Sequence, residues 1–301
     1  MDTSVDMEKF RRDGYLRLGG LFSAEEMAAF NRNADACQAA RAAGESIGED
    51  LLANRHLRHV MLDERILSVA RTLIGGKPIY FGDGQFVVHK PTGKVGTYHK
   101  DNVDRLDNDG PDWRSEYNLV RFGVYLEPHA GTSGGLLVQA GSHKHVAHSR
   151  VSEVLNEELV RPLTFKARYM GLPLGDVVVW NLRLTHAGMG RYLRLAPFIP
   201  ITERNGRFVP EFLKSSPVSG QRRAVFFTLG AAGPHMDRYV TYLKTRGYQI
   251  ETWKNSPYGQ PERDAAKGKD VEIRDMHAEI LADLAAGRPV GQSRKWQPQP
   301  Y

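Results

Sequence analysis

The central part of the chain contains short runs rich in Val, Phe, Tyr and Leu, and this pattern constrains the fold more than any other feature. Clusters of Gly, Pro, Asp and Asn separate the runs, as turns separate strands. No helical periodicity alternates with them, which favours an antiparallel sandwich or barrel over a parallel α/β sheet. The runs cover residues 79–90, 118–129, 134–143, 176–186 and 222–230.

Helical patterns flank these runs on both sides. Ser23 with Glu26 fits a capping box, and the alanine-rich run after it predicts a helix to about Ala43. Residues 63–74 place their apolar side chains on one stripe, which Gly75 ends, and helical patterns return at 236–247 and 275–287. We therefore expect a single domain, 1–301, with an N-terminal helical part (1–78), a β-core (79–232) and a C-terminal helical cover and tail (233–301).

Composition narrows the possible environment and partners. The 301 residues include 25% charged residues and carry a formal charge of +6, but Lys and Arg are interspersed with Asp and Glu, so we expect no nucleic-acid partner. A basic pocket for a small anionic cosubstrate is the preferred interpretation. The chain shows no secretory signal and no membrane-length apolar stretch, and its single cysteine, Cys37, excludes an intrachain disulfide. We expect a cytoplasmic protein without a membrane partner; a homo-oligomer is possible and stays open.

Three residues form the candidate metal site. His99 and Asp101 are two apart, so in an extended chain both side chains point to one face. His186 ends the run 176–186, where continued strand alternation would place it on the apolar face of Val178 and Trp180. Two histidines and one carboxylate on one face of an ion suit non-haem Fe(II) oxygen chemistry. The alternative is a turn histidine beside a solvated aspartate, with His186 as a satisfied core residue.

A second histidine cluster competes with this assignment. His143, His145 and His148 lie close together in the segment HKHVAH. No carboxylate accompanies them at ligand spacing, so we interpret the segment as a solvated loop.

The order of segments resembles the phytanoyl-CoA dioxygenase family of Fe(II)/2-oxoglutarate oxygenases. The resemblance is carried by MEKFRRDGYLRLGGLFSAEEMAAF, HKPTGKVGTYHKDNVD, TSGGLLVQAGSHKH and GDVVVWNLRLTHAG, and it spans roughly residues 7–230. It implies a mainly β fold with flanking helices around a double-stranded β-helix (jelly-roll, cupin-like) core. It also implies His99, Asp101 and His186 as catalytic iron ligands, with Fe(II), 2-oxoglutarate and O2 as cofactor and cosubstrates. The implied reaction is hydroxylation of a small molecule, and the retained Asp101 carboxylate argues against halogenation.

The resemblance further implies an arginine that binds the distal carboxylate of 2-oxoglutarate, in the strand after the distal histidine. Arg222 in RRAVFFTLG fits best, and Arg223 is the choice if the register slips by one. An intervening segment, 188–221, departs from the family pattern; we interpret it as an inserted loop over the mouth of the site, as a lid or substrate wall. If the insertion is interpreted differently, Arg191 or Arg194 becomes the anchor.

Two other functions remain open at this point. A cupin-type isomerase or dioxygenase would need no 2-oxoglutarate, and a degenerate jelly-roll protein would only bind a ligand. The sequence does not identify the substrate. Nor does it decide among hydroxylation, desaturation, epimerisation and cyclisation.

Overall fold

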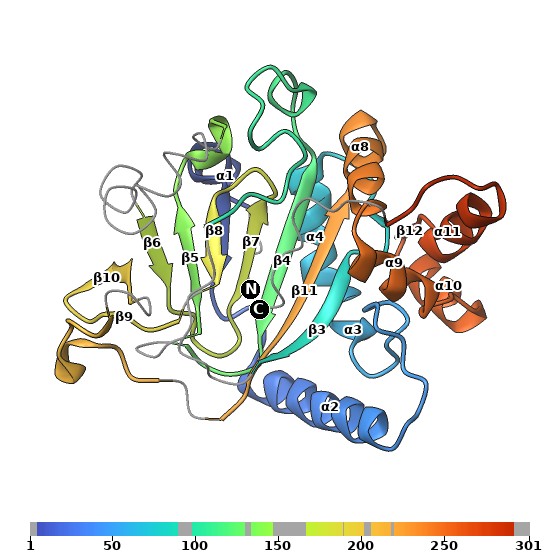
Figure 1. Cartoon of the computed structure of the whole chain (residues 1–301). Helices are drawn as coiled ribbons and strands as arrows, with labels where there is room; N and C mark the ends of the chain where they lie inside the picture. The colour runs from blue at the N-terminus through green and yellow to red at the C-terminus, as the bar shows by residue number, and fades with distance from the viewer. Residues whose placement is uncertain are drawn as a thin grey trace.

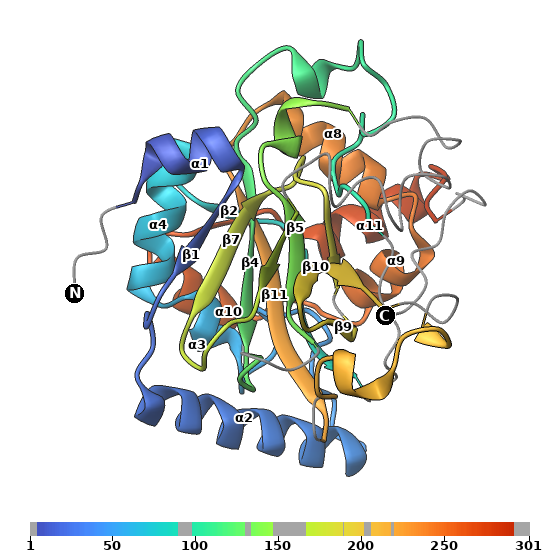
Figure 2. The same cartoon turned by 90° about the vertical axis from the view of Figure 1, so that its left-hand side faces the viewer.

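Two mainly antiparallel sheets face each other in the computed structural model, which describes residues 5–89, 98–129, 134–146, 167–188, 190–201, 206–217 and 220–291. Within these residues the major sheet has the strand order β1-β7-β4-β11-β2-β12, with β3 also paired to β11, and the minor sheet has the order β6-β5-β8 (Figures 1 and 2). The major-sheet strands are β1 (Tyr15–Leu18), β2 (Ile79–Tyr80), β3 (Gly84–His89), β4 (Leu119–Tyr125), β7 (Val177–Asn181), β11 (Arg222–Gly230) and β12 (Glu272–Ile273). The minor-sheet strands are β5 (Leu136–Gln139), β6 (Ala167–Met170) and β8 (His186–Gly188). All five predicted runs form strands.

Side-chain alternation divides the major sheet into two faces. One face packs under the N-terminal helices; Phe122 of β4 and Phe227 of β11 are fully buried there. The other face turns toward the minor sheet, where Trp180, Tyr125 and Ala224 join residues of β5 in a second core. The site is built on this inner face.

Four helices form the described N-terminal part: α1 (Met7–Asp13), α2 (Ala24–Ala42), α3 (Arg58–Met61) and α4 (Glu64–Ile74). Two of them, α2 and α4, begin and end where the sequence predicts. The capping box at the start of α2 is complete: the Ser23 hydroxyl accepts from the backbone N–H of Glu26, and the Ser23 N–H donates to the Glu26 carboxylate. Gly75 ends α4 with a left-handed φ of 70°, which glycine adopts without steric cost. Figure 1 shows α2 crossing the ends of the strands and α4 behind the major sheet.

The C-terminal part is more than a helical cover. It contains α8 (Pro234–Leu243), α9 (Gly247–Lys254), α10 (Gln260–Lys267) and α11 (Met276–Ala285), gathered on the side of the molecule away from β6 (Figure 1). Its short strand β12 extends the major sheet by pairing parallel to β2, which the sequence did not predict. Gln249 and Trp253 each donate to the carbonyl of Gly82 at 2.8 Å, so α9 is fastened to the loop between β2 and β3. In the described part of the chain, no helix is long and apolar enough to cross a membrane.

The run 176–186 is not one strand, so the predicted alternation to His186 was wrong. β7 ends at Asn181, and the Leu184 N–H then donates to the Asn181 carbonyl in a turn. β8 starts at His186 in the other sheet, paired with β5. His186 still points inward, because the turn carries the chain across the gap between the sheets and not because the strand continues.

The described part of the predicted insertion packs on the outer face of the minor sheet. It contains β9 (Tyr192–Leu193), β10 (Ala196–Pro200) and the 3-10 turn η3 (Glu211–Leu213). Tyr192 is buried with Leu137 and Ala187, whose side chains alternate away from the inner face. These contacts place the described part of the insertion behind the site, and its role as a lid or substrate wall stays a prediction.

Candidate metal centre

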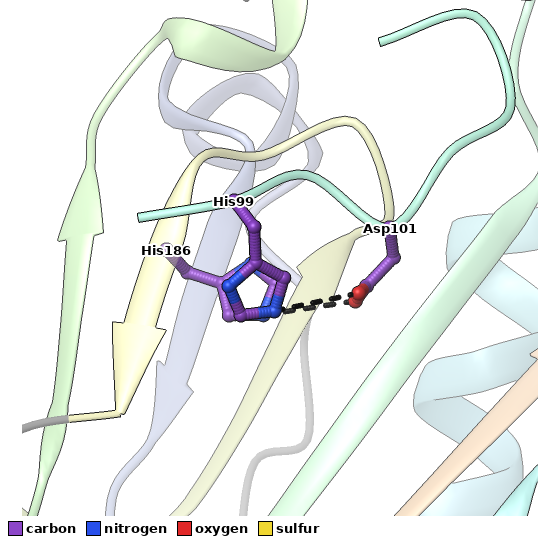
Figure 3. A group of neighbouring side chains, drawn as sticks. All are labelled: His99, Asp101 and His186. Carbon is purple, nitrogen blue, oxygen red and sulfur yellow. Dashed lines mark ion pairs between the residues drawn. The ribbon is translucent and has the colours of Figure 1, made fainter. Parts of the chain in front are cut away.

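The structure brings His99, Asp101 and His186 together at one end of the space between the sheets (Figure 3). One donor atom from each side chain lies within 4.8 Å of the other two. His99 Nε2 is 3.7 Å from Asp101 Oδ1, and His186 Nε2 is 3.6 Å from Asp101 Oδ2. Asp101 and His186, which are 85 positions apart in the sequence, therefore belong to one cluster. Among the described residues it is the one group of His, Cys, Asp and Glu with this geometry.

Backbone hydrogen bonds set the directions of these side chains. His99 and His186 exchange N–H···O bonds of 2.9 and 3.0 Å as an antiparallel bridge, so their side chains lie on the same face. Their rings lie 4.4 Å apart at an angle of 52°. The Asp101 N–H donates to the Leu182 carbonyl at 3.0 Å, which keeps the segment extended, and Asp101 thus returns to the face of His99 as the sequence predicts.

The protonation states suit metal binding. Burial and the nearby His99 together lower the pKa of His186 to about 4, against the opposing effect of Asp101. His186 is therefore neutral at pH 7. Its Nδ1 lies 3.0 Å from the Leu184 carbonyl, which can only accept, so Nδ1 carries the proton and Nε2 presents its lone pair toward Asp101.

Asp101 is ionised although it is buried. Burial opposes ionisation, but at the low pH where Asp101 titrates, protonated His186 and His99 outweigh burial, so the pKa of Asp101 lies below its usual value. Its Oδ2 is buried and has no hydrogen-bond partner among the residues that the structure describes. A buried anionic oxygen without a donor is costly, and a bound cation would satisfy it.

The spacing of the donor atoms fits a divalent metal ion. Two donors 3.6 or 3.7 Å apart can both lie at metal-ligand distances of about 2.1 Å from one ion placed between them. Two imidazoles and one carboxylate on one side also match the ligand set of non-haem Fe(II) centres. The residues present therefore fit the ion that the sequence suggested.

An aromatic inner wall connects the cluster with the first residue of β11. The Trp180 ring lies 5.3 Å from that of His186, and Phe226 contacts both Trp180 and Tyr125. The Arg222 guanidinium lies 5.4 Å from the Tyr125 ring centroid, on the inner face shared by Ala224 and Phe226. The Nε of Arg222 is buried, with no hydrogen-bond partner in the described part of the chain.

The other candidate arginines are bound elsewhere. Arg223 alternates to the outer face, where it donates to Glu127, Asp35 and Asn31. Arg191 donates to the Ser215 carbonyl and pairs with Glu211. Arg194 is exposed. The structure thus favours Arg222 among the arginines considered.

Sequence reasoning missed residues around this arginine. His129 is fully buried 5.2 Å from the Tyr125 ring, and a Cβ on Gly134 would lie 2.7 Å from the His129 ring. Gly134 has a φ of 103°, a conformation that L side chains rarely adopt. Strand alternation in the run 118–129 could have identified Tyr125 as inward-facing. No local sequence pattern predicts that His129 packs against Tyr125.

The competing histidine cluster does not form a metal site in the described residues. His143 was predicted to lie in a solvated loop, which was wrong: it is 5% exposed, with its Nε2 3.1 Å from the Arg11 carbonyl. Burial lowers its pKa to about 4, so it is a neutral structural residue. His145 is exposed, and His148 lies outside the described residues.

Comparisons with known proteins agree with this fold and cluster. A jelly-roll core with His99, Asp101 and His186 at one end has the architecture of the non-haem iron oxygenases. A family model described as phytanoyl-CoA dioxygenase matches residues 10–190, which is more than half of the chain. The chain belongs to the phytanoyl-CoA dioxygenase family, as the sequence motifs indicated. Fe(II), 2-oxoglutarate and dioxygen are the cofactor and cosubstrates of this family.

The individual relatives are distant. The chain is 30% identical over 155 residues to ectoine dioxygenase of Stutzerimonas stutzeri (strain A1501), a match covering 46% of this chain and 50% of the relative, so it spans about half the length of that relative. HygX from Streptomyces hygroscopicus, solved with nickel and 2-oxoglutarate, is 17% identical with a TM-score of 0.54, covering 76% of this chain and 88% of HygX. EctD from S. alaskensis, solved with 2-oxoglutarate and 5-hydroxyectoine, is 17% identical with a TM-score of 0.50, covering 76% and 77%. At such identities the structures show a shared fold.

Proposed function

We propose that this protein is an Fe(II)- and 2-oxoglutarate-dependent dioxygenase that hydroxylates an unactivated C–H bond of a small molecule and releases succinate and CO2. The observation that carries the proposal is the convergence of His99, Asp101 and His186 within 4.8 Å around an unpartnered buried carboxylate oxygen. The name of the relative, ectoine dioxygenase, is in keeping with a small-molecule substrate. Since Asp101 keeps its carboxylate, hydroxylation is expected and halogenation is not.

The proposed ligands occupy one side of the metal position. Bound Fe(II) with 2-oxoglutarate would supply the chemistry that reduces dioxygen and oxidises the substrate. His99, Asp101 and His186 would hold the ion from one face and leave its other positions open toward the inner wall. The hydrogen bond from His186 Nδ1 to Leu184 would keep that ring in the orientation required for binding through Nε2.

Arg222 is the proposed partner of the distal carboxylate of 2-oxoglutarate. A guanidinium presents parallel N–H donors that match the two oxygens of a carboxylate. Arg222 is on the inner face and has a buried Nε without a partner in the described chain, whereas Arg223 is held by Glu127, Asp35 and Asn31. The family model ends at residue 190, so this assignment depends on the geometry of β11 and on the resemblance of its sequence.

The inner wall would exclude water from the reacting centre. Trp180 and Tyr125 are each 1% exposed, and the Phe226 ring lies 6.3 Å from the Trp180 ring and 5.7 Å from the Tyr125 ring. An apolar wall of this kind protects a strong oxidant from solvent and from side reactions. A substrate C–H bond would be held against it.

Anaerobic ligand binding tests the proposal. Adding Fe(II) and 2-oxoglutarate to the metal-free protein should produce the weak visible charge-transfer band of the chelate, and His99→Ala should abolish it. His145→Ala is the matched control, because His145 is exposed and outside the cluster. Absence of the band in the wild-type protein would refute the proposal. A screen of small molecules for stimulated succinate release would then identify the substrate.

A cytoplasmic location for this protein is part of the same proposal. Cys37 is buried and free, as expected for a protein in a reducing cytoplasm. Cell fractionation tests this.

A further inference from the structure

The two segments that carry the proposed ligands share little backbone pairing. His99 and His186 exchange two hydrogen bonds, and the N–H groups of Asp101 and Asn102 donate to the carbonyl of Leu182 at 3.0 and 3.3 Å. A two-stranded contact this short is marginally stable by itself in water. Other contacts must therefore fix the spacing of the three ligands.

Lys100 lies between two of these ligands, and its side chain points away from them. Side chains alternate along an extended segment, so Lys100 takes the face opposite to His99 and Asp101. It is only 2% exposed, and its Nζ donates to the carbonyls of Ser142 and Arg183, both at 2.6 Å. A buried ammonium group is costly unless its donors are satisfied, and these two carbonyls provide short, charge-assisted bonds.

Both acceptors belong to segments that lead to His186. Arg183 lies in the turn between β7 and β8, and Ser142 begins the 3-10 turn η2 (Ser142–Lys144). The Ser142 hydroxyl also accepts from the N–H of Thr185 at 2.8 Å, directly before His186. Lys100 thus joins the His99–Asp101 segment to η2 and to the turn that delivers the third ligand.

An indole ring completes the surroundings of this ammonium group. The Trp113 ring centroid lies 5.7 Å from Lys100 Nζ and 5.5 Å from the Arg183 guanidinium. Cations at this distance from an indole are attracted to its electron-rich face. Trp113 Nε1 donates to the Asp104 carbonyl at 2.9 Å, which holds the ring in the segment after the ligand pair.

We propose that Lys100 is a positioning residue whose ammonium group clamps the His99–Asp101 segment to the turn before His186 and thereby sets the spacing of the metal ligands. The inference rests on the proposed metal centre. An apolar side chain of similar length would fill the volume but could not hold two carbonyls. Lys100→Met removes the desolvation cost of a buried ammonium group but takes a donor from two carbonyls, of which that of Ser142 still accepts from the His145 N–H at 3.2 Å. Because these two effects on fold stability oppose each other, metal affinity should respond more strongly than fold stability.

Co(II) titration of the metal-free protein separates these two effects. We expect Lys100→Met to raise the Kd for Co(II) by about 10- to 100-fold, as is typical when the partners that orient metal ligands are lost. The intensity of the Co(II) d–d bands should change because the ligand geometry changes. The Tm of the metal-free variant should stay within about 3 °C of wild type, a shift worth roughly 1 kcal/mol. Lys100→Arg, which keeps the charge, should recover part of the affinity.

Lys144→Met is the matched control, since Lys144 is an exposed lysine two residues from Ser142. It should bind Co(II) like the wild type. Equal affinity in Lys100→Met and wild type would overturn the inference, and so would a loss of affinity that accompanies a large fall in the Tm of the metal-free protein and is not restored by arginine. If the wild-type protein binds no Co(II) at all, the proposed metal centre itself fails, which is a distinguishable result.

Discussion

Replacing Arg222 or Arg223 by methionine should separate cosubstrate binding from fold stability. The two residues are adjacent on β11 but point to opposite faces of the major sheet. Arg222 lies on the inner face beside Tyr125, whereas Arg223 is bonded to side chains of α2 and to Glu127. Methionine keeps a long apolar stem and removes only the guanidinium group, so the same change tests both positions.

The expected magnitudes follow from these environments. Loss of one partner from a buried, hydrogen-bonded charge pair costs about 2–5 kcal/mol, so Arg222→Met should weaken 2-oxoglutarate binding by roughly 100-fold. For Arg223, the Asp35 side chain is 67% exposed and contributes little, while Glu127 is 21% exposed. The charged bonds to Glu127 and Asn31 together should contribute about 2–3 kcal/mol to the free energy of unfolding.

Two measurements on the same preparations test this. Anaerobic titration of the Fe(II)-loaded protein with 2-oxoglutarate, followed by the charge-transfer band, gives the Kd. Urea unfolding followed by circular dichroism gives the stability. We expect Arg222→Met to change mainly the Kd and Arg223→Met mainly the urea midpoint. The reverse pattern, or a normal Kd in both variants, would show that the anchor lies elsewhere.

Three further outcomes are expected. Co(II) at 100 times its Kd should raise the Tm by about 5 °C in wild type and not in His99→Ala; an equal rise in both would place the ion elsewhere. Burial raises the pKa of Asp50 from 3.8 to about 6, so its stabilising contribution is present below about pH 4 and lost as the pH rises through 6. The free energy of unfolding of Asp50→Asn, measured in urea and taken relative to that of the wild type, should therefore increase by about 3 kcal/mol from pH 4 to pH 7. A difference between the two proteins that does not change with pH would contradict this. Gly134→Ala should weaken 2-oxoglutarate binding by roughly tenfold, because the added Cβ would meet His129 at 2.7 Å and Arg222 at 3.3 Å; an unchanged Kd would show that the Arg222 environment is not required.

The elements that the sequence predicts correctly are those whose causes are local. The capping box of Ser23 and Glu26 and the stop at Gly75 act within a few residues, and the structure contains both. The strand runs are also local patterns of residue type. β12 was missed because it has only two residues and owes its conformation to pairing with β2, which is far away in the sequence.

The candidate site also combines features with local causes and features that depend on distant parts of the chain. The common face of His99 and Asp101 follows from alternation over three residues, which needs no knowledge of the rest of the chain. The approach of His186 depends instead on the turn after Asn181, which moves the chain from the major to the minor sheet. Periodicity extended through that turn predicted the inward direction, but it assigned the wrong strand and the wrong sheet. The family resemblance supplied what spacing could not.

Buried polar side chains mark the limit of sequence reasoning in this protein. A lysine between two ligands has the sequence appearance of a solvated residue, and a histidine in HKHVAH has the appearance of a loop residue. Lys100 is buried because carbonyls of Ser142 and Arg183 meet its ammonium group, and His143 because the Arg11 carbonyl meets its ring. Each acceptor is a backbone carbonyl, which every residue type carries. The residue types in the sequence therefore do not indicate which carbonyls will meet a buried side chain. If the clamp at Lys100 sets the ligand spacing, then part of the metal affinity is encoded in carbonyl positions, and substitutions that move η2 should change metal binding without touching a ligand.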